Sequence, residues 1–197
     1  MRAQLRQQDG VSVLRLHGAP LVLVNALRRC ILRDVATLAV TRVRIKANCS
    51  NFWDEYISHR IALLPFCGSP GRVRLNVTAT SPQPETVMSA AIEGTATTRC
   101  ALSDVPLLRL MEGQTLHLEA EVGYGSGQQH ARFAPGVCWI TDAGEEEYDL
   151  HLDPRDGLDA VAIFQEGLRC MERVVDRMLT YDVLSTQALG EEGATVA

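Results

Sequence analysis

One short stretch of the chain carries most of the residue types that could do chemistry. Residues 53–66, WDEYISHRIALLPF, place two carboxylates, a histidine and an arginine ahead of an apolar run that Pro65 interrupts. In a helix, Glu55 and His59 lie four positions apart and can touch, so with Asp54 they could act as acid, base and metal ligand. A zinc-binding helix supplies two histidines and a general base, however, and here the second histidine is missing. The pattern therefore favours capping, pairing along the helix and surface contact over catalysis.

The other motifs that could bind or react are weaker. The glycine-rich run GYGSG at 123–127 could cradle a phosphate, but a phosphate loop opens a helix and carries a lysine, whereas QQHARFAP follows here. We interpret it as a hairpin or as a turn that lets another segment approach closely. No GxSxG nucleophile motif is present, and His117 and His151 alternate with leucines, as solvent-facing strand positions do.

Composition and charge narrow the class of protein. The 197 residues are 46% hydrophobic, which is enough for a real core in one large domain or two small ones. A net charge of −5 argues against a protein whose main task is to bind phosphate backbones. No run approaches the roughly 20 apolar residues of a membrane span, and the start MRAQLRQQDG lacks the apolar stretch of a signal peptide. We expect a soluble intracellular protein without membrane contact and without direct sequence-specific DNA binding.

The cysteines do not suggest a metal site. They lie at least eighteen positions apart, at Cys30, Cys49, Cys67, Cys100, Cys138 and Cys170. This spacing contains no CxxC pair that could hold zinc or an iron–sulfur cluster in a local loop. We therefore expect buried, reduced thiols and no metal or other cofactor.

The two ends of the chain predict strands and amphipathic helices. Residues 11–17 alternate as a half-buried strand does, and from residue 20 apolar side chains recur at helical spacing. Three arginines fall on another side of that helix: Arg28, Arg29 and Arg33. Near the other end, a strand at 148–152 precedes the longest helical pattern. Its apolar positions are spaced 3, 4, 3, 4, 3, at Val161, Phe164, Leu168, Met171, Val175 and Met178. Such a stripe needs a second helix packed against it.

The middle of the chain is rich in strand-like patterns. Residues 39–46, 72–80 and 115–122 alternate apolar and polar side chains, and turn signals such as SPQP and EGQ separate such runs. Ser50 or Asn51 offers an N-cap for the helix that contains the opening stretch, and the first turn of that helix is acidic.

The order of elements predicts an α+β fold with an insertion. We expect a discontinuous domain, a sheet plus two helices, to take residues 1–42 and 147–186. An inserted β-rich domain would take residues 43–146. Residues 187–197 are small and polar and would form a disordered tail.

Three blocks of the sequence recur, in this order, in one known family. They are NALRR at 25–29 with TLAVTRVRIKANCS at 37–50, then DE at 54–55 with HRIALLP at 59–65, then SDVPLLRLMEGQTLHLEAEVGYGSGQQHARFAP at 103–135. Together they closely resemble the α-like assembly subunit of archaeal and eukaryotic DNA-directed RNA polymerases, the larger member of the α-like heterodimer. Compact polymerases of large DNA viruses would also suit so short a chain. The resemblance covers the chain from about residue 11 to 184.

This resemblance implies a noncatalytic structural subunit. Members of the family pair through their helices with a smaller α-like subunit, and the heterodimer is the platform on which the second-largest and then the largest polymerase subunit assemble. The nucleotidyl-transfer site, with its magnesium carboxylates, would lie on those large subunits. The chain ends would then be a dimerisation domain, and the protein would act in the nucleus or cytoplasm, or in a virion if it is viral.

The resemblance also implies two sets of interface residues. The large-subunit interface would contain Asn25, Arg28, Arg29, Leu32, Asp54, Glu55, His59 and Arg60. The dimerisation interface would be the apolar stripe, at Val161, Phe164, Leu168, Met171, Val175 and Met178. The zinc loop or iron–sulfur domain of some relatives is not supported, because that region holds only Cys100.

Two alternatives stay open. One is a bacterial-type α subunit that works as a homodimer, which shares only the NALRR block. The other is a stand-alone hydrolase that uses Asp54, Glu55 and His59.

Overall fold

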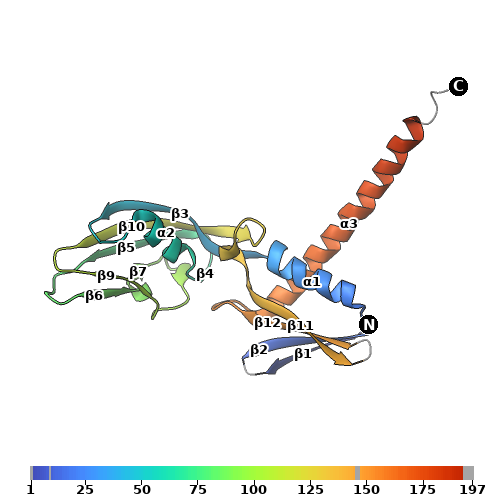
Figure 1. Ribbon diagram of the computed structural model, residues 1–197, viewed down its shortest axis with the longest axis horizontal. Helices are drawn as coiled ribbons and strands as arrows, with labels where there is room; N and C mark the ends of the chain where they lie inside the picture. Colours follow the sequence, from blue (N-terminus) through green and yellow to red (C-terminus); the bar gives the residue numbers. More distant parts are fainter. Residues whose placement is uncertain (1, 9, 145–146, 193–197) are drawn as a thin grey trace.

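The computed structural model describes residues 2–8, 10–144 and 147–192, with side chains as far as residue 180 (Figure 1). Helices and antiparallel sheets are both present, which confirms the predicted α+β class. Within these residues, no helix combines the length and hydropathy that crossing a bilayer requires.

One four-stranded sheet is built from the two ends of the chain. Its order is β1-β2-β12-β11, and each neighbouring pair is antiparallel. The strands are β1 (Arg2–Gln8), β2 (Val11–His17), β12 (Glu147–Pro154) and β11 (Gly136–Gly144). Alternation along β2 and β12 places Leu14 opposite Leu150, and both are buried on the same face. We call this the end sheet.

Two helices cover that face of the end sheet and pack against each other. α1 (Leu21–Asp34) buries Val24, Leu27 and Ile31, which recur on one side of the helix as predicted. α3 (Ala160–Glu192) packs against α1 near Gly167, where an added Cβ would lie 2.5 Å from Ile31 Cγ1. Gly167 therefore allows the two helices to approach closely. Each large apolar side chain buried in this core contributes about 1.5–3 kcal/mol. The same core also contains Leu16, Cys138, Leu152, Ile163 and Phe164.

A second four-stranded sheet, the middle sheet, has the order β3-β10-β5-β7 and is also antiparallel. Its strands are β3 (Ala36–Asn48), β10 (Thr115–Ser126), β5 (Gly71–Thr78) and β7 (Ile92–Glu93). Two short pairs accompany it: β4 (Phe66–Gly68) with β8 (Thr98–Cys100), and β6 (Glu85–Met88) with β9 (Pro106–Leu110). Single turns of 3-10 helix lie at η1 (Ser89–Ala91) and η2 (Ala131–Phe133).

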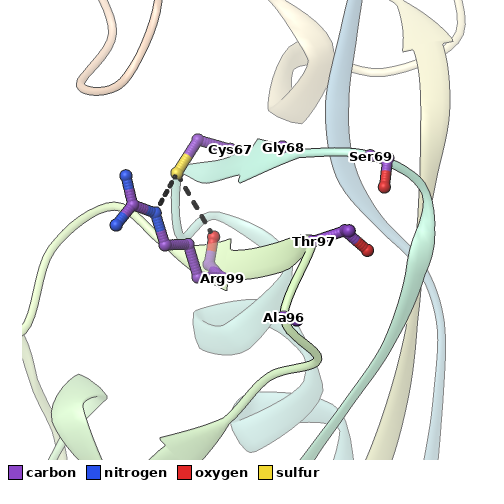
Figure 2. A pocket seen from close by; sticks show the side chains of 6 residues that line it. All are labelled: Cys67, Gly68, Ser69, Ala96, Thr97 and Arg99. Atoms are coloured by element: carbon purple, nitrogen blue, oxygen red, sulfur yellow. Dashed lines mark hydrogen bonds between the residues drawn. The ribbon is translucent and has the colours of Figure 1, made fainter.

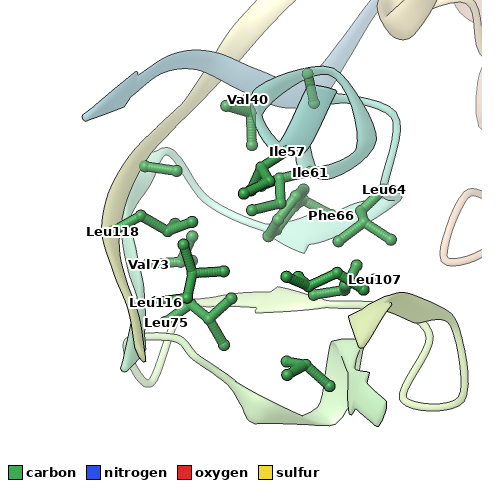
Figure 3. Close-up of a cluster of buried hydrophobic side chains, with 14 of the residues drawn as sticks. Val40, Ile57, Ile61, Leu64, Phe66, Val73, Leu75, Leu107, Leu116 and Leu118 are labelled. Carbon is green, nitrogen blue, oxygen red and sulfur yellow. The ribbon is translucent and has the colours of Figure 1, made fainter. Parts of the chain in front are cut away.

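The helix α2 (Asp54–Ala62) covers one face of the middle sheet. Figure 3 shows Ile57 and Ile61 pointing from α2 into a cluster with Val73, Leu75 and Leu116 of the sheet. Because the strands alternate, the neighbours of these sheet residues point to the opposite, open face. Each sheet thus has its own core and one helix-covered face.

Hydrogen bonds to backbone carbonyls tie the two sheets together. Arg155, just after β12, donates from Nη2 to Leu38 O of β3 at 2.7 Å and from Nη1 to Arg132 O. Burial lowers the pKa of the Arg155 guanidinium, and the two carbonyls replace part of the water that it loses. Thr37 Oγ1 donates to Phe133 O at 2.6 Å in the same region. Figure 1 shows α3 extending from this junction past α1.

The start of α2 differs from the expectation. The N-cap is Trp53, without a side-chain cap, rather than Ser50 or Asn51. Ser50 is used earlier, because its backbone N donates to Asn48 Oδ1 at 3.0 Å and closes a turn at the end of β3.

The end of α3 also differs. The helix passes residue 187, where the predicted tail begins, and continues to Glu192. Residues 178–192 contain no proline, and leucine and glutamate, which favour a helix, recur among them. Residues 193–197 of the predicted tail lie outside the described residues.

Candidate interaction surfaces

The opening stretch of the sequence does not form a catalytic arrangement. Asp54, Glu55 and His59 are exposed on α2, and Asp54 Oδ1 accepts a hydrogen bond from Asn48 Nδ2 at 2.8 Å. The described contacts include no hydrogen bond or ion pair between Glu55 and His59. Nor do the described residues contain a group of three or more histidine, cysteine or acidic side chains placed to hold a metal ion. The geometry therefore gives no support to a hydrolase on α2.

Aromatic side chains lie beside these polar residues in the sequence, at Phe52, Trp53 and Tyr56. The rings of Phe52 and Tyr56 stack with centroids 5.0 Å apart, and Arg60 Cζ lies 5.9 Å from the Tyr56 centroid. Arg60 Nη2 donates to Pro106 O at 2.5 Å, which holds the guanidinium in place. Trp53 at the N-cap is 81% exposed. Exposed aromatic and arginine side chains are typical of interface hot spots. The predicted contacts included only the charged and polar residues of this stretch, so Trp53, Tyr56 and Phe52 were missed.

The outer side of α1 is polar and arginine-bearing. Asn25 and Arg29 are exposed, and Arg28 Nε donates to Asn25 Oδ1 at 3.0 Å. Leu32 is half-buried and packs on the core of the end sheet. Burial raises the pKa of the Cys138 thiol on β11 to about 12, and the nearby Arg28 charge opposes this only in part.

The two groups of predicted large-subunit contacts are therefore not one patch. α1 lies on the end sheet and α2 on the middle sheet, and Figure 1 shows them separated along the molecule. The predicted large-subunit contacts thus lie on two separate polar surfaces, one on each sheet.

The apolar stripe of α3 is divided between the inside and the outside. Phe164 is 4% exposed and Met171 packs against the same core, so both face α1 and the end sheet. This side of α3 packs against α1, which approaches closely at Gly167. The remaining positions are 42–66% exposed, at Val161, Leu168, Val175 and Met178. Leu179, which the sequence argument left out, is 64% exposed beside them. We call these five residues the α3 apolar flank.

The glycine-rich run packs against other parts of the chain. A Cβ at Gly127 would lie 2.0 Å from Leu32 O, and a Cβ at Gly125 would lie 2.6 Å from Phe133 Cζ. Gln128 N donates to Arg33 O at 2.9 Å, so the segment after β10 contacts the end of α1. The predicted turn is wrong for most of this run, because residues 123–126 form the end of strand β10 and the turn begins only at Gly127. The close contacts at Gly125 and Gly127 leave no room for a phosphate cradle there.

The strand histidines also have structural surroundings. His151 stacks on Trp139 with centroids 5.0 Å apart, and its Nε2 lies 2.7 Å from Thr141 Oγ1. His117 is half-buried on the open face of the middle sheet. Neither residue lies in a cluster with metal-binding geometry among the described residues.

The thiols are free but not all buried. Cys30, Cys138 and Cys170 are buried, whereas Cys49 is exposed, because it lies at the end of β3 where the strand leaves the core. Cys67 lines an open pocket of about 440 Å³ with Thr97 and Arg99, and its Sγ lies 3.3 Å from Arg99 Nε (Figure 2). This pocket offers one charged side chain, already in contact with the thiol, and so indicates no particular ligand.

Comparison with known proteins gives a consistent result. No protein-family model matches the chain. Over 163 residues it is 27% identical to "DNA-directed RNA polymerase subunit Rpo3" of Methanocaldococcus jannaschii, which covers 82% of this chain and 85% of that protein. The Rpo3 of Archaeoglobus fulgidus is 35% identical over 156 residues, or 68% of this chain and 58% of the relative. "DNA-directed RNA polymerase II subunit rpb3" of Dictyostelium discoideum is 25% identical over 172 residues and is covered to 57%. The chain thus spans little more than half the length of the second and third relatives.

Proposed function

Because the chain is a homologue of subunit 3, the α-like subunit, of archaeal and eukaryotic DNA-directed RNA polymerases, we propose that it is a noncatalytic assembly subunit of such an enzyme. In this role it pairs with a smaller α-like subunit, and the pair then offers a platform to the second-largest and largest polymerase subunits. The similarity to these relatives supports membership in a DNA-directed RNA polymerase. The exposed surfaces of this chain support the assembly role.

The observation that carries the proposal is the α3 apolar flank. Val161, Leu168 and Val175 are seven positions apart, so they form one row along the helix, and Leu179 continues it one turn later. All are at least 42% exposed in this chain. Covering one such side chain contributes up to about 1.5–3 kcal/mol, which favours a permanent partner over exposure to water. A row with this spacing fits a helix of the partner.

The outer side of α1 and the exposed end of α2 are the contacts for the large subunits in this proposal. Asn25, Arg28 and Arg29 offer donors on α1, beside Leu32. The α2 contacts are Asp54, Glu55, His59 and Arg60, together with the exposed Trp53 and Tyr56. Because the two surfaces lie on different sheets, assembly uses two separate contacts, one near each sheet.

The strand pairing supports a revised division of the chain. β11 pairs with β12 in the end sheet, and β3 belongs to the middle sheet from Ala36 onward. We therefore propose that the dimerisation domain consists of the residues up to 35 and from 136 onward. The first boundary moves from residue 42 to residue 35 and the second from residue 147 to residue 136, so each moves by about the length of one strand.

Co-expression with the smaller α-like subunit of the same source tests the pairing. The mass of the purified complex is measured by size-exclusion chromatography with light scattering. Val175→Glu places a charge in the α3 apolar flank and is expected to abolish the one-to-one complex. Thr180→Glu, on an exposed position of the same helix, is the matched control and is expected to leave the complex intact.

Two results would overturn the pairing. One is a Val175→Glu chain that binds the smaller subunit as well as the wild-type chain does. The other is a wild-type chain that forms a stable homodimer and ignores the smaller subunit, which would favour the bacterial-type alternative.

A further inference from the structure

The open face of the middle sheet carries a concentration of positive charge. Val73 and Leu75 of β5 point into the core under α2, so the residues that alternate with them point away from it. The same holds for β3 and β10. Five basic side chains share this open face, and we call them the basic face: Arg42, Arg44 and Lys46 on β3, and Arg72 and Arg74 on β5.

Acidic side chains of β10 lie between the two basic rows. The strand register places Glu119 opposite Arg44 and Arg74, and Glu121 opposite Arg42 and Arg72. Glu93 of β7 lies opposite Arg74 at the far edge. The face therefore has five basic and three acidic residues, in a chain whose net charge is −5.

Both glutamates of β10 already form ion pairs with basic residues of this face. Glu119 Oε1 is 2.6 Å from Lys46 Nζ and 3.4 Å from Arg74 Nε, and the hydrogen bond from Lys46 is the main reason that the pKa of Glu119 is lowered. Glu121 Oε1 is 3.6 Å from Arg72 Nη2.

Arg42 and Arg44 are left over. Neither forms an ion pair with any carboxylate among the described residues, although both are exposed. They are two positions apart on β3, so their side chains leave the same face about 7 Å apart. Guanidinium groups form bidentate pairs with carboxylates. Arg42, Arg44 and Arg72 also line a small hollow with the two glutamates.

We propose that the basic face binds an extended acidic segment of another protein, in which aspartate or glutamate alternates with other residues. In an extended segment, alternate carboxylates point to one side at the spacing of Arg42 and Arg44. This inference does not rest on the polymerase role, because it uses a face that neither α1, α2 nor α3 occupies.

Two features favour an acidic protein over a nucleic acid. The described positions of the open face on β3, β10 and β5 carry no phenylalanine, tyrosine or tryptophan on which a base could stack. The row formed by Glu119 and Glu121 lies between the basic rows and repels the phosphates of a backbone laid across the sheet. A segment that runs along β3 can instead pair with Arg42 and Arg44 and avoid that row.

Fluorescence anisotropy with the full chain tests the proposal. The probes are a labelled peptide of alternating glutamate and threonine, a peptide of the same composition with its glutamates in one block, and single-stranded and duplex DNA of mixed sequence. The wild-type chain is expected to bind the alternating peptide most tightly, with an affinity that falls as salt is added.

Charge reversal identifies the face. Arg42→Glu with Arg44→Glu is expected to weaken binding of the alternating peptide at least about tenfold. The matched control reverses Arg99 and Arg109, which are exposed on β8 and β9, and is expected to bind like the wild-type chain. Thermal melting of each variant, and the milder pair Arg42→Gln with Arg44→Gln, separate loss of binding from loss of fold.

Several outcomes would overturn the proposal. They are tighter binding to either DNA than to the peptide, equal binding of the alternating and block peptides, equal loss in the control variant, or no peptide binding at low salt. The smaller α-like subunit should still bind the Arg42→Glu, Arg44→Glu chain. If this variant failed to bind the smaller subunit, the result would count against the assembly role. It would not change the conclusion from the peptide measurements.

Discussion

The two sheets differ in which charged and apolar side chains are paired or buried and which are left exposed. On the open face of the end sheet, Asp149 is 7% exposed and accepts two hydrogen bonds from Arg15 at 2.7 Å and one from Arg6 at 2.6 Å. On the open face of the middle sheet, Arg42 and Arg44 have no carboxylate partner among the described residues. At Asp149 the end sheet thus pairs its charges internally, whereas Arg42 and Arg44 of the middle sheet remain available.

Apolar surface is also distributed differently. The helix on the middle sheet buries Ile57 and Ile61 but leaves the aromatic Trp53 exposed at its start. The longest helix on the end sheet leaves the aliphatic Leu168 and Val175 exposed. Apolar surface suits a permanent interface, and unpaired charge suits a reversible, salt-dependent one. The difference favours two kinds of contact on the two sheets, a permanent apolar one at the end sheet and a reversible charged one at the middle sheet.

The largest expected effect separates the inner and outer sides of α3. Phe164→Ala should lower the free energy of unfolding by about 3–5 kcal/mol, because it opens a cavity against α1. Leu168→Ala, at a half-exposed position, should change it by less than about 0.5 kcal/mol in the isolated chain. Urea denaturation of the isolated chain measures both. Equal losses for the two variants would mean that the helix faces are assigned wrongly.

The next effect compares the two charged faces. Asp149→Asn should destabilise the chain by about 2 kcal/mol, because Arg15 loses its charged partner where little water can replace it. Glu119→Gln should have a much smaller effect, because its basic neighbours stay in contact with water. Thermal unfolding at neutral pH checks this order. A larger loss for Glu119→Gln would contradict the contrast between the sheets.

A third effect concerns docking through α1. Arg29→Ala should leave the melting temperature and the α-like pairing nearly unchanged, since the side chain is exposed. Co-assembly with the second-largest subunit should weaken by about thirtyfold, the loss of about 2 kcal/mol that is typical of a truncated interface arginine. Arg109→Ala on β9 is the control. Wild-type assembly by Arg29→Ala would remove the support for this surface.

The smallest effect is the acid response of Asp149. Its pKa is lowered, first by the hydrogen bond from Arg15 and then by the charges of Arg15 and Arg6. The stability that Asp149 adds is therefore fully present above its unfolded pKa of about 3.9 and is lost as the pH falls through the folded value. Melting temperatures of the wild-type and Asp149→Asn chains should converge as the pH is lowered. A constant gap down to low pH would show that ionisation of Asp149 contributes nothing.

Alternation and helical spacing predicted most elements, because burial on one face leaves a period in the sequence. Val24, Leu27 and Ile31 identified α1 and its buried side in this way. The same period could not separate the buried from the exposed residues of the α3 stripe. Phe164 and Leu168 both fit the helical spacing, although only Phe164 faces α1. That division depends on Gly167, whose role appears only when the two helices meet.

Pairing between strands and exposure of aromatic residues were also beyond the sequence. Nothing in the pattern of residues 136–144 shows that this strand pairs with β12 instead of the middle sheet. Trp53 and Tyr56 belong to residue types that are usually buried, so their exposure on α2 could not be read from type alone. The basic face, by contrast, left a signal in the alternating arginines of β3 and β5, at positions 42, 44, 72 and 74.

Site-specific photo-crosslinking in the assembled polymerase tests the central claim most directly. A photoreactive amino acid replaces Val175 of the α3 apolar flank in one chain and Arg29 of α1 in another, and the crosslinked subunits are identified by mass spectrometry. The account predicts that position 175 crosslinks to the smaller α-like subunit and position 29 to a large subunit. Crosslinking of position 175 to a large subunit, or of both positions to the same partner, would contradict it.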